Sequence, residues 1–126
     1  MWVKNHHVLG RADYHYRHEP FFYGWKKGAT HNFYGGGLKS TAWDIKRPEN
    51  SDLHPTMKPV ELILEILKNS SKEEDIVLDL FLGSGTSVIA AEKSNRICYG
   101  IEIDPFYCDV IIKRWEEYTG KKAEKL

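Results

Sequence analysis

The chain has 126 residues, and its 18 Lys and Arg balance its 18 Asp and Glu, so the formal net charge is zero. This length predicts one small domain with a modest core, and the sequence has neither a long apolar span nor a signal peptide. Cys98 is expected in a strand and Cys108 in a helix, so both suit buried free thiols, which are typical of a reducing compartment. We therefore expect a soluble, cytoplasmic protein.

Positive charge is concentrated in residues 1–50. Eight Lys and Arg stand there against four Asp and Glu, which gives +4, and the rest of the chain carries −4. The same region contains ten Trp, Tyr and Phe residues. This mixture suits either a surface that faces nucleic acid or a small β-region whose aromatic side chains pack on strand faces. We therefore expect residues 1–50 to form a basic, aromatic, β-rich region with its connection to the rest.

That connection begins at Gly35, Gly36 and Gly37 and continues through residues 38–51, which predict a flexible segment without an element of its own. Five of the six histidines lie in residues 1–50, but their spacing matches no recognised set of metal ligands. The sequence also lacks a Cys-x-x-Cys pair. We expect no metal site.

The next element is a helix from Val60 to Lys68, which follows the segment His54-Pro55-Thr56-Met57-Lys58-Pro59. Pro59 suits the first helical turn, where its missing N–H costs nothing. The polar residues of this helix share one narrow face, so most of the helix should be buried. On its own, this segment is also compatible with an ordinary core helix.

A buried strand is predicted from Ile76 to Phe81, because its apolar run suits a parallel sheet covered on both faces. Gly83 and Gly85 then permit a sharp turn and close backbone approach to a ligand. Residues 86–93 recover a helical composition with small side chains. The pattern indicates a ligand site at the turn, although a generic connection between strand and helix also contains glycines.

A second strand is expected from Ile97 to Ile103, and Glu102 near its end stands where a nucleotide-binding βαβ unit places the acid that accepts hydrogen bonds from ribose hydroxyls. Asp104 and Pro105 then suit an N-cap and a first helical position. We expect the helix to run through Tyr118 and to stop near Gly120, with Asp104 serving either the cofactor or only the cap.

The spacing of the glycines limits the class of cofactor. A phosphate-binding P-loop needs a lysine after its last glycine, where this chain has Thr86 and Ser87. A dinucleotide fingerprint needs a third small residue where this chain has Val88, so a nicotinamide-dependent oxidoreductase is the weaker alternative. S-adenosylmethionine carries no phosphate and is the remaining common candidate. It needs an acid for its ribose, a glycine backbone beside its methionine moiety and an apolar slot for its adenine.

Three segments together resemble the DNA amino-methyltransferases, which methylate the exocyclic amine of adenine or cytosine. Members of that family carry a His-Pro-Thr-x-Lys-Pro segment, an Asp-x-Phe-x-Gly-Ser-Gly-Thr turn and a strand that ends in Gly-Ile-Glu-x-Asp. In this chain the segments are residues 54–59, 79–86 and 100–104, in the same order and at similar spacing. Leu80 and Leu82 depart from the family's usual proline and glycine, but neither change removes a polar group.

The resemblance implies an α/β fold: a partial Rossmann-like methyltransferase sheet with flanking helices, preceded by an antiparallel strand pair between Trp2 and Lys26. Residues 1–50 and the S-adenosylmethionine-binding βαβ-type region 51–126 would together form one incomplete domain. It also implies a set of cofactor-binding residues. These are His54, Thr56, Lys58, Asp79, Phe81, Gly83, Ser84, Gly85, Thr86, Glu102, Ile103 and Asp104.

The resemblance assigns each group a role around the cofactor. Asp79 and the turn would border the methionine and ribose, Glu102 would bind the ribose hydroxyls, and Ile103 would pack against adenine. The segment around Thr56 and Lys58 would close over the methionine end. DNA would be the substrate, with its target base flipped out of the stack.

The family's catalytic signature, an Asp, Asn or Ser followed by Pro-Pro and an aromatic residue, is absent because no Pro-Pro dipeptide occurs in the sequence. Residues 104–107 imitate it, but they follow the strand of the ribose-binding acid. We therefore assign no catalytic residue and expect the C-terminal, cofactor-binding half of the enzyme, inactive alone. Its unpaired strands predict association with another copy or with a missing N-terminal segment. An inactive remnant is the remaining alternative.

Overall fold

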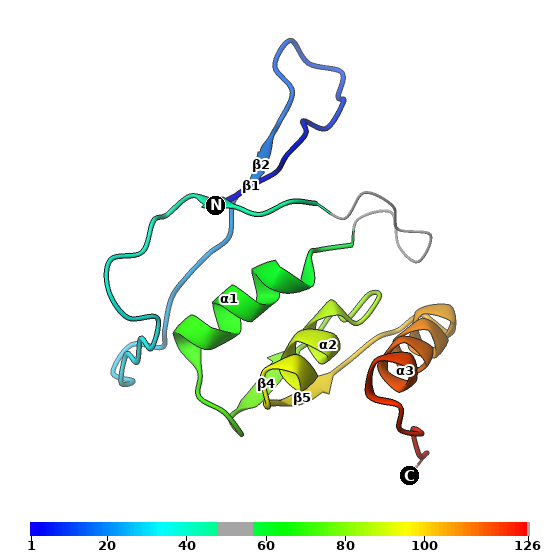
Figure 1. Ribbon diagram of the computed structural model, residues 1–126. Coiled ribbons are helices and arrows are strands. Elements are labelled where there is room, and N and C mark those ends of the chain that lie inside the picture. Colours follow the sequence, from blue (N-terminus) through cyan, green and yellow to red (C-terminus); the bar gives the residue numbers. More distant parts are fainter. Residues whose placement is uncertain (48–56, 126) are drawn as a thin grey trace.

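The structure is a computed structural model that describes residues 1–47 and 57–125. Figure 1 shows short N-terminal strands on one side of α1 and a unit of alternating strands and helices on the other. The elements in chain order are β1 (Trp2–Val3), β2 (His18–Glu19), β3 (Trp43–Asp44), α1 (Val60–Ser70), β4 (Ile76–Asp79), α2 (Thr86–Lys93), β5 (Ile97–Gly100) and α3 (Pro105–Thr119).

The N-terminal strands form a small sheet in the order β2-β1-β3. β1 pairs antiparallel with β2, with Trp2 opposite Glu19, so the predicted strand pair is present. β3 pairs parallel with β1 and lies within residues 38–51, where we expected a connection without an element. That expectation was wrong because the partner of β3 is distant in sequence: the Trp43 N–H donates to the Met1 carbonyl at 3.0 Å.

β4 and β5 form the predicted parallel pair, joined by α2, with Ile76 opposite Ile97 and Asp79 opposite Gly100. Both strands are shorter than expected, but their pairing continues as loop hydrogen bonds. The Ile101 N–H donates to the Asp79 carbonyl at 3.0 Å, and the Leu82 N–H donates to the Ile101 carbonyl at 3.1 Å. The chain after β4 is thereby held beside the chain after β5.

The helices α1 and α2 pack together against one face of this strand pair. Their contact buries Leu67, Ala90 and Ala91, and Val77 and Cys98 of the strands pack against these residues. The small side chains of Ala90 and Ala91 allow α2 to pack closely against α1 and the strand pair. Helix α1 begins at Val60 with Pro59 as its N-cap rather than in its first turn. Three residues of α1, Leu62, Leu67 and Asn69, are fully buried, and its other apolar side chains are only partly buried, so less of the helix is buried than expected.

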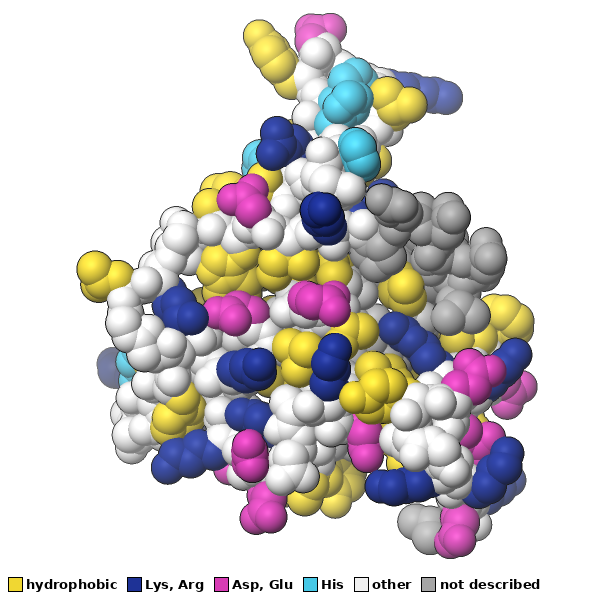
Figure 2. Space-filling view, in the orientation of Figure 1, with side chains coloured by type: hydrophobic (Ala, Val, Ile, Leu, Met, Phe, Trp, Pro, Cys, Tyr) yellow, Lys and Arg dark blue, Asp and Glu magenta, His cyan; other side chains and the backbone are white. Residues whose placement is uncertain are grey.

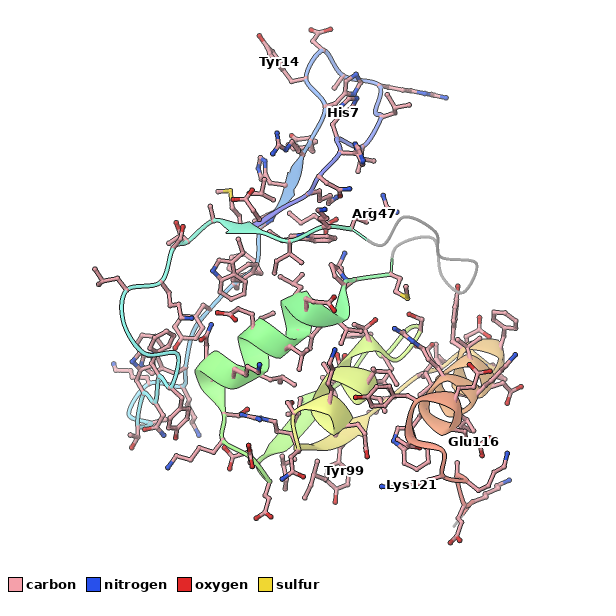
Figure 3. All side chains as sticks on the ribbon, viewed as in Figure 1. His7, Tyr14, Arg47, Tyr99, Glu116 and Lys121 are labelled. Atoms are coloured by element: carbon pink, nitrogen blue, oxygen red, sulfur yellow. The ribbon has the colours of Figure 1, made fainter. Side chains whose placement is uncertain are left out.

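The other face of the strand pair is open. Side chains alternate between the two faces of a strand, and the outward set here consists of large apolar residues. Ile76, Leu78, Ile97 and Tyr99 are 50% to 67% exposed, and Tyr99 points away from α1 (Figure 3). The prediction that both faces are covered was therefore wrong for this chain.

The N-terminal hairpin that carries β1 and β2 projects from the rest of the chain (Figure 1). Figure 2 shows histidine side chains gathered on it, and the rings of His7 and His15 stack with centroids 5.4 Å apart. Within residues 1–47 and 57–125, no three His, Cys, Asp or Glu side chains are grouped as metal ligands. Nor does any helix in that part of the chain have the length and apolarity needed to cross a bilayer.

Candidate functional site

The turn between β4 and α2 is the centre of the site. Gly85 is the N-cap of α2 and adopts a left-handed conformation, with φ of 78°, and Gly83 has φ of 53°. The Gly85 N–H donates to the Leu82 carbonyl at 2.9 Å and closes the turn. A Cβ atom on Gly85 would lie 2.9 Å from Cγ1 of Ile111 on α3. Glycine is therefore required at residue 85 both for backbone conformation and for helix packing.

Asp79 ends β4 and holds both sides of the turn. Its Oδ1 accepts a hydrogen bond from the Phe81 N–H at 3.0 Å, and its Oδ2 accepts one from the Ser87 hydroxyl at 2.5 Å. Partial burial raises the pKa of the neighbouring Cys98 thiol, and the negative charge of Asp79 raises it further. Cys98 is therefore a neutral thiol packed against the core of Leu67, Ala90 and Ala91, and both cysteines are free.

Glu102 follows β5 and reaches back to the turn. Its Oε2 accepts a hydrogen bond from the Gly83 N–H at 2.7 Å, and its Oε1 accepts from the N–H groups of Ile103 and Asp104 at 2.9 and 3.0 Å. Three backbone donors thus orient the carboxylate at the shared edge of the sheet. Asp104 is the N-cap of α3, since its side chain accepts from the Phe106 N–H at 2.9 Å.

Two apolar side chains stand exposed at the same edge. Phe81 is 88% exposed and Ile103 is 95% exposed, and they follow β4 and β5 respectively. Large apolar groups left in water are costly, so both can gain by covering a planar apolar ligand. The edge thus combines an oriented carboxylate, a glycine turn and apolar side chains.

Lys58 is connected to this site by its backbone, whereas its ammonium group is directed elsewhere. The Thr86 hydroxyl donates to the Lys58 carbonyl at 3.3 Å. The Lys58 Nζ lies 2.6 Å from Oε2 of Glu19 and 5.7 Å from the ring centroid of Trp2. The contacts of Lys58 Nζ thus join the segment before α1 to β1 and β2, away from the turn.

Glu19 is shared by two lysines. Its Oε1 lies 2.5 Å from Nζ of Lys4, whose side chain is almost fully buried. Partial burial raises the pKa of the Glu19 carboxyl, but the hydrogen bonds from Lys4 and Lys58 outweigh that effect and leave the pKa below its ordinary value. The carboxylate therefore stays ionised and ties the N-terminal sheet to Lys58.

A separate apolar cavity of about 320 Å³ lies between the aromatic N-terminal region and the end of α1. Phe21 and Trp43 line it and pack on each other with ring centroids 4.9 Å apart, and Phe22 also lines it although its side chain is fully exposed. Trp25 stacks on His31 at 3.9 Å. Some aromatic side chains of this region therefore pack on one another beside the N-terminal strands, and others face solvent.

The structure describes ten of the twelve expected site residues. Asp79, Phe81, Ile103, Asp104, Glu102 and residues 83–86 lie together at the carboxyl edge of β4 and β5. His54 and Thr56 lie outside the described residues. The sequence interpretation missed Arg114 of α3, whose guanidinium contacts Ser84 in the turn. No motif marks it, and its only signal is a position one helical turn after Ile111.

Comparison with known proteins agrees with this architecture. The family model for DNA methylases of the N6 and N4 type matches residues 1–114. The type II methyltransferase M.XycI of Xanthomonas campestris pv. cyanopsidis is 35% identical over 98 residues, and M.Cfr9I of Citrobacter freundii is 32% identical over 97. Each match covers 76% of this chain and 32% of the relative, so the chain spans about a third of the length of these curated proteins.

A solved structure shows the same relation in three dimensions. The crystal structure of the M1.HpyAVI-SAM complex superimposes with a TM-score of 0.71 at 29% identity, and the match covers 90% of this chain and 58% of that one. The family match extends over the turn, both strand ends and most of α3. The chain therefore belongs to the N6/N4 DNA methylase family.

Proposed function

We propose that this chain is the cofactor-binding portion of a DNA amino-methyltransferase, an enzyme that transfers a methyl group from S-adenosylmethionine to the exocyclic amine of adenine or cytosine. The observation that carries the proposal is the position of Glu102, whose carboxylate lies at the carboxyl edge of β4 and β5 and is bound to the Gly83 N–H at 2.7 Å. Ligands of open α/β sheets bind at this edge. The family match and the M1.HpyAVI-SAM complex support the choice of cofactor.

The residues present fit S-adenosylmethionine. Glu102 accepts three backbone N–H bonds, which hold its carboxylate at the carboxyl edge of β4 and β5, where a ribose hydroxyl could donate to it. Phe81 and Ile103 expose the apolar surface that an adenine ring would cover. Asp79 and residues 83–86 would border the methionine and ribose. In this proposal Asp104 contributes backbone, because its side chain caps α3.

The bound cofactor would supply an activated methyl group on its sulfonium. The chain's own groups would bind and orient it: Glu102 through the ribose and the turn through the methionine moiety. DNA would present the target amine only after the base is flipped out, because the amine is otherwise paired within the stack. The basic, partly exposed aromatic region 1–47 suits contact with DNA phosphates and bases.

We further infer that the two regions form one methyltransferase domain that is incomplete by itself. The open apolar face of β4 and β5 would be covered by another copy or by further methyltransferase sequence. Because the sequence holds no Pro-Pro tetrapeptide of the catalytic type, the isolated chain should not methylate DNA. A methyl-transfer assay on mixed-sequence DNA should be negative, and robust incorporation would reject this part of the proposal.

The ribose assignment is tested by substituting Glu102. The wild-type chain should bind S-adenosylmethionine weakly, and Glu102→Ala should abolish the heat of binding in a calorimetric titration. Glu73→Ala is the matched control, because Glu73 is an exposed carboxylate before β4 and away from the sheet edge. Unchanged binding by Glu102→Ala would reject the assignment, and loss in both variants would trace the effect to charge alone.

A further inference from the structure

The glycine turn is held from two sides. On the strand side, the Leu82 N–H donates to the Ile101 carbonyl at 3.1 Å and the Gly83 N–H donates to Glu102. The next residue, Ser84, is 4% exposed and makes its contacts on the other side, where α3 passes. The turn therefore depends on α3 for its second support.

Arg114 supplies that support through one guanidinium nitrogen. Its Nη1 donates to the Ser84 carbonyl at 2.9 Å and lies 3.4 Å from the hydroxyl oxygens of Ser84 and Thr86. In the described part of the chain, no carboxylate forms an ion pair with Arg114. Its polar contacts are thus made with the turn.

Helix electrostatics do not account for this placement. Thr86 is the first residue of α2, and the N-terminus of a helix is its positive end, so a cation there opposes the helix dipole. Half-burial also lowers the pKa of the Arg114 guanidinium. The position of Arg114 is therefore electrostatically unfavourable. It is offset by the hydrogen bonds that the guanidinium makes to oxygens of the buried turn.

A second contact comes from the same helix. Ile111 lies three residues before Arg114, which places both side chains on one side of α3. Its Cγ1 would lie 2.9 Å from a Cβ atom at Gly85, so the backbone of the turn fits closely against α3. Ile111 thus sets the position of Gly85, and Arg114 sets the direction of the Ser84 carbonyl.

We propose that Arg114 is a positioning residue, which fixes the backbone of residues 83–86 in the conformation that receives the methionine moiety of the cofactor. This inference rests on the proposed function, because it assigns the turn to the methionine end. It distinguishes the two ends of the cofactor: Glu102 holds the ribose, and the turn braced by Arg114 receives the methionine. Lysine cannot replace arginine fully, because its ammonium group keeps the charge but lies one bond nearer to the backbone than Nη1 of arginine.

The experiment compares two ligands by NMR titration of the complete chain. Arg114→Met keeps the apolar stem and removes the guanidinium, and it should weaken S-adenosylmethionine binding about tenfold, the scale of a hydrogen bond to a charged group. Adenosine lacks the methionine moiety, so its affinity should change less than about twofold. Lys113→Met is the matched control, because Lys113 is an exposed cation of α3 in an i,i+4 pair with Glu117.

The outcomes separate this inference from the proposed function. Equal binding of S-adenosylmethionine by wild type and Arg114→Met would overturn the role of Arg114 alone. Equal losses for both ligands would also overturn it, because a merely structural role weakens both. No binding by the wild type would overturn both proposals. If Arg114→Met fails to fold by circular dichroism, Arg114→Lys takes its place and should show a smaller loss confined to S-adenosylmethionine.

Discussion

Gly85 combines two constraints that can be separated by substitution. A side chain there would face both a left-handed backbone, with φ of 78°, and the Ile111 side chain at 2.9 Å. Gly120 has a similar φ of 70° at the end of α3 but nothing within 4 Å of its Cβ position. Each alanine substitution should cost about 1 kcal/mol or more for the backbone. Gly85→Ala should cost a further 1 to 3 kcal/mol, roughly, for overpacking.

Chemical denaturation of the two variants measures this difference in the free energy of unfolding. Gly120→Ala acts as the internal reference, because it carries the backbone cost without the steric one. Gly85→Ala should be the less stable of the two variants. Equal destabilisation would show that α3 moves away from the turn without cost, and Ile111 would then have no role in setting its position.

Individual residues also show where reasoning from sequence succeeds. Asp79, Gly83 and Glu102 belong to local patterns whose spacing follows from a strand, a turn and a helix, and their predicted meeting point is present. Arg114 contacts Ser84 from 30 residues away, and Glu19 contacts Lys58 from 39. These contacts depend on how separate elements pack, and a single sequence carries no periodic signal for such a partner.

At the scale of elements, the open face of β4 and β5 makes a prediction about association. Leu78 and Tyr99 are 64% and 60% exposed on neighbouring parallel strands. Exposed apolar faces and unpaired strand edges promote association. The chain should therefore self-associate at micromolar concentration, and the double substitution Leu78→Lys and Tyr99→Lys should shift it toward monomer in light scattering.

Leu38→Lys is the matched control for that measurement. Leu38 is fully exposed, and it lies in the segment before β3 rather than on the strand pair. The same chemical change there should leave association unaltered. A strictly monomeric wild-type chain would contradict the prediction. If Leu38→Lys lowered association as much as the double substitution does, added charge would explain the effect and the open face would not.

The elements differ in how far local sequence determines them. α2 and α3 were predicted closely, because glycine, aspartate and proline mark their ends. β3 was missed, since two residues gain their strand geometry only by pairing with β1 about forty positions away. The apolar run of β4 correctly indicated a parallel sheet, but it could not indicate that one face of the strand pair lacks its cover in this chain.

At the scale of the whole molecule, one ion-pair cluster connects the two regions. Glu19 of β2 binds Lys4 beside β1 and Lys58 before α1, and the Lys58 carbonyl accepts a hydrogen bond from Thr86 at the turn. The N-terminal sheet is thereby linked to the proposed cofactor site through short contacts. This connection supports treating residues 1–47 and 57–125 as parts of one methyltransferase domain.

A paired calorimetric titration of the wild-type chain will show whether the edge formed by β4 and β5 binds S-adenosylmethionine. S-adenosylmethionine should bind with a dissociation constant on the order of 0.1 mM, about −5.5 kcal/mol. NAD should give no heat of binding, because the turn lacks the third small residue of a dinucleotide fingerprint. Binding of NAD in preference to S-adenosylmethionine, or binding of neither, would contradict the account.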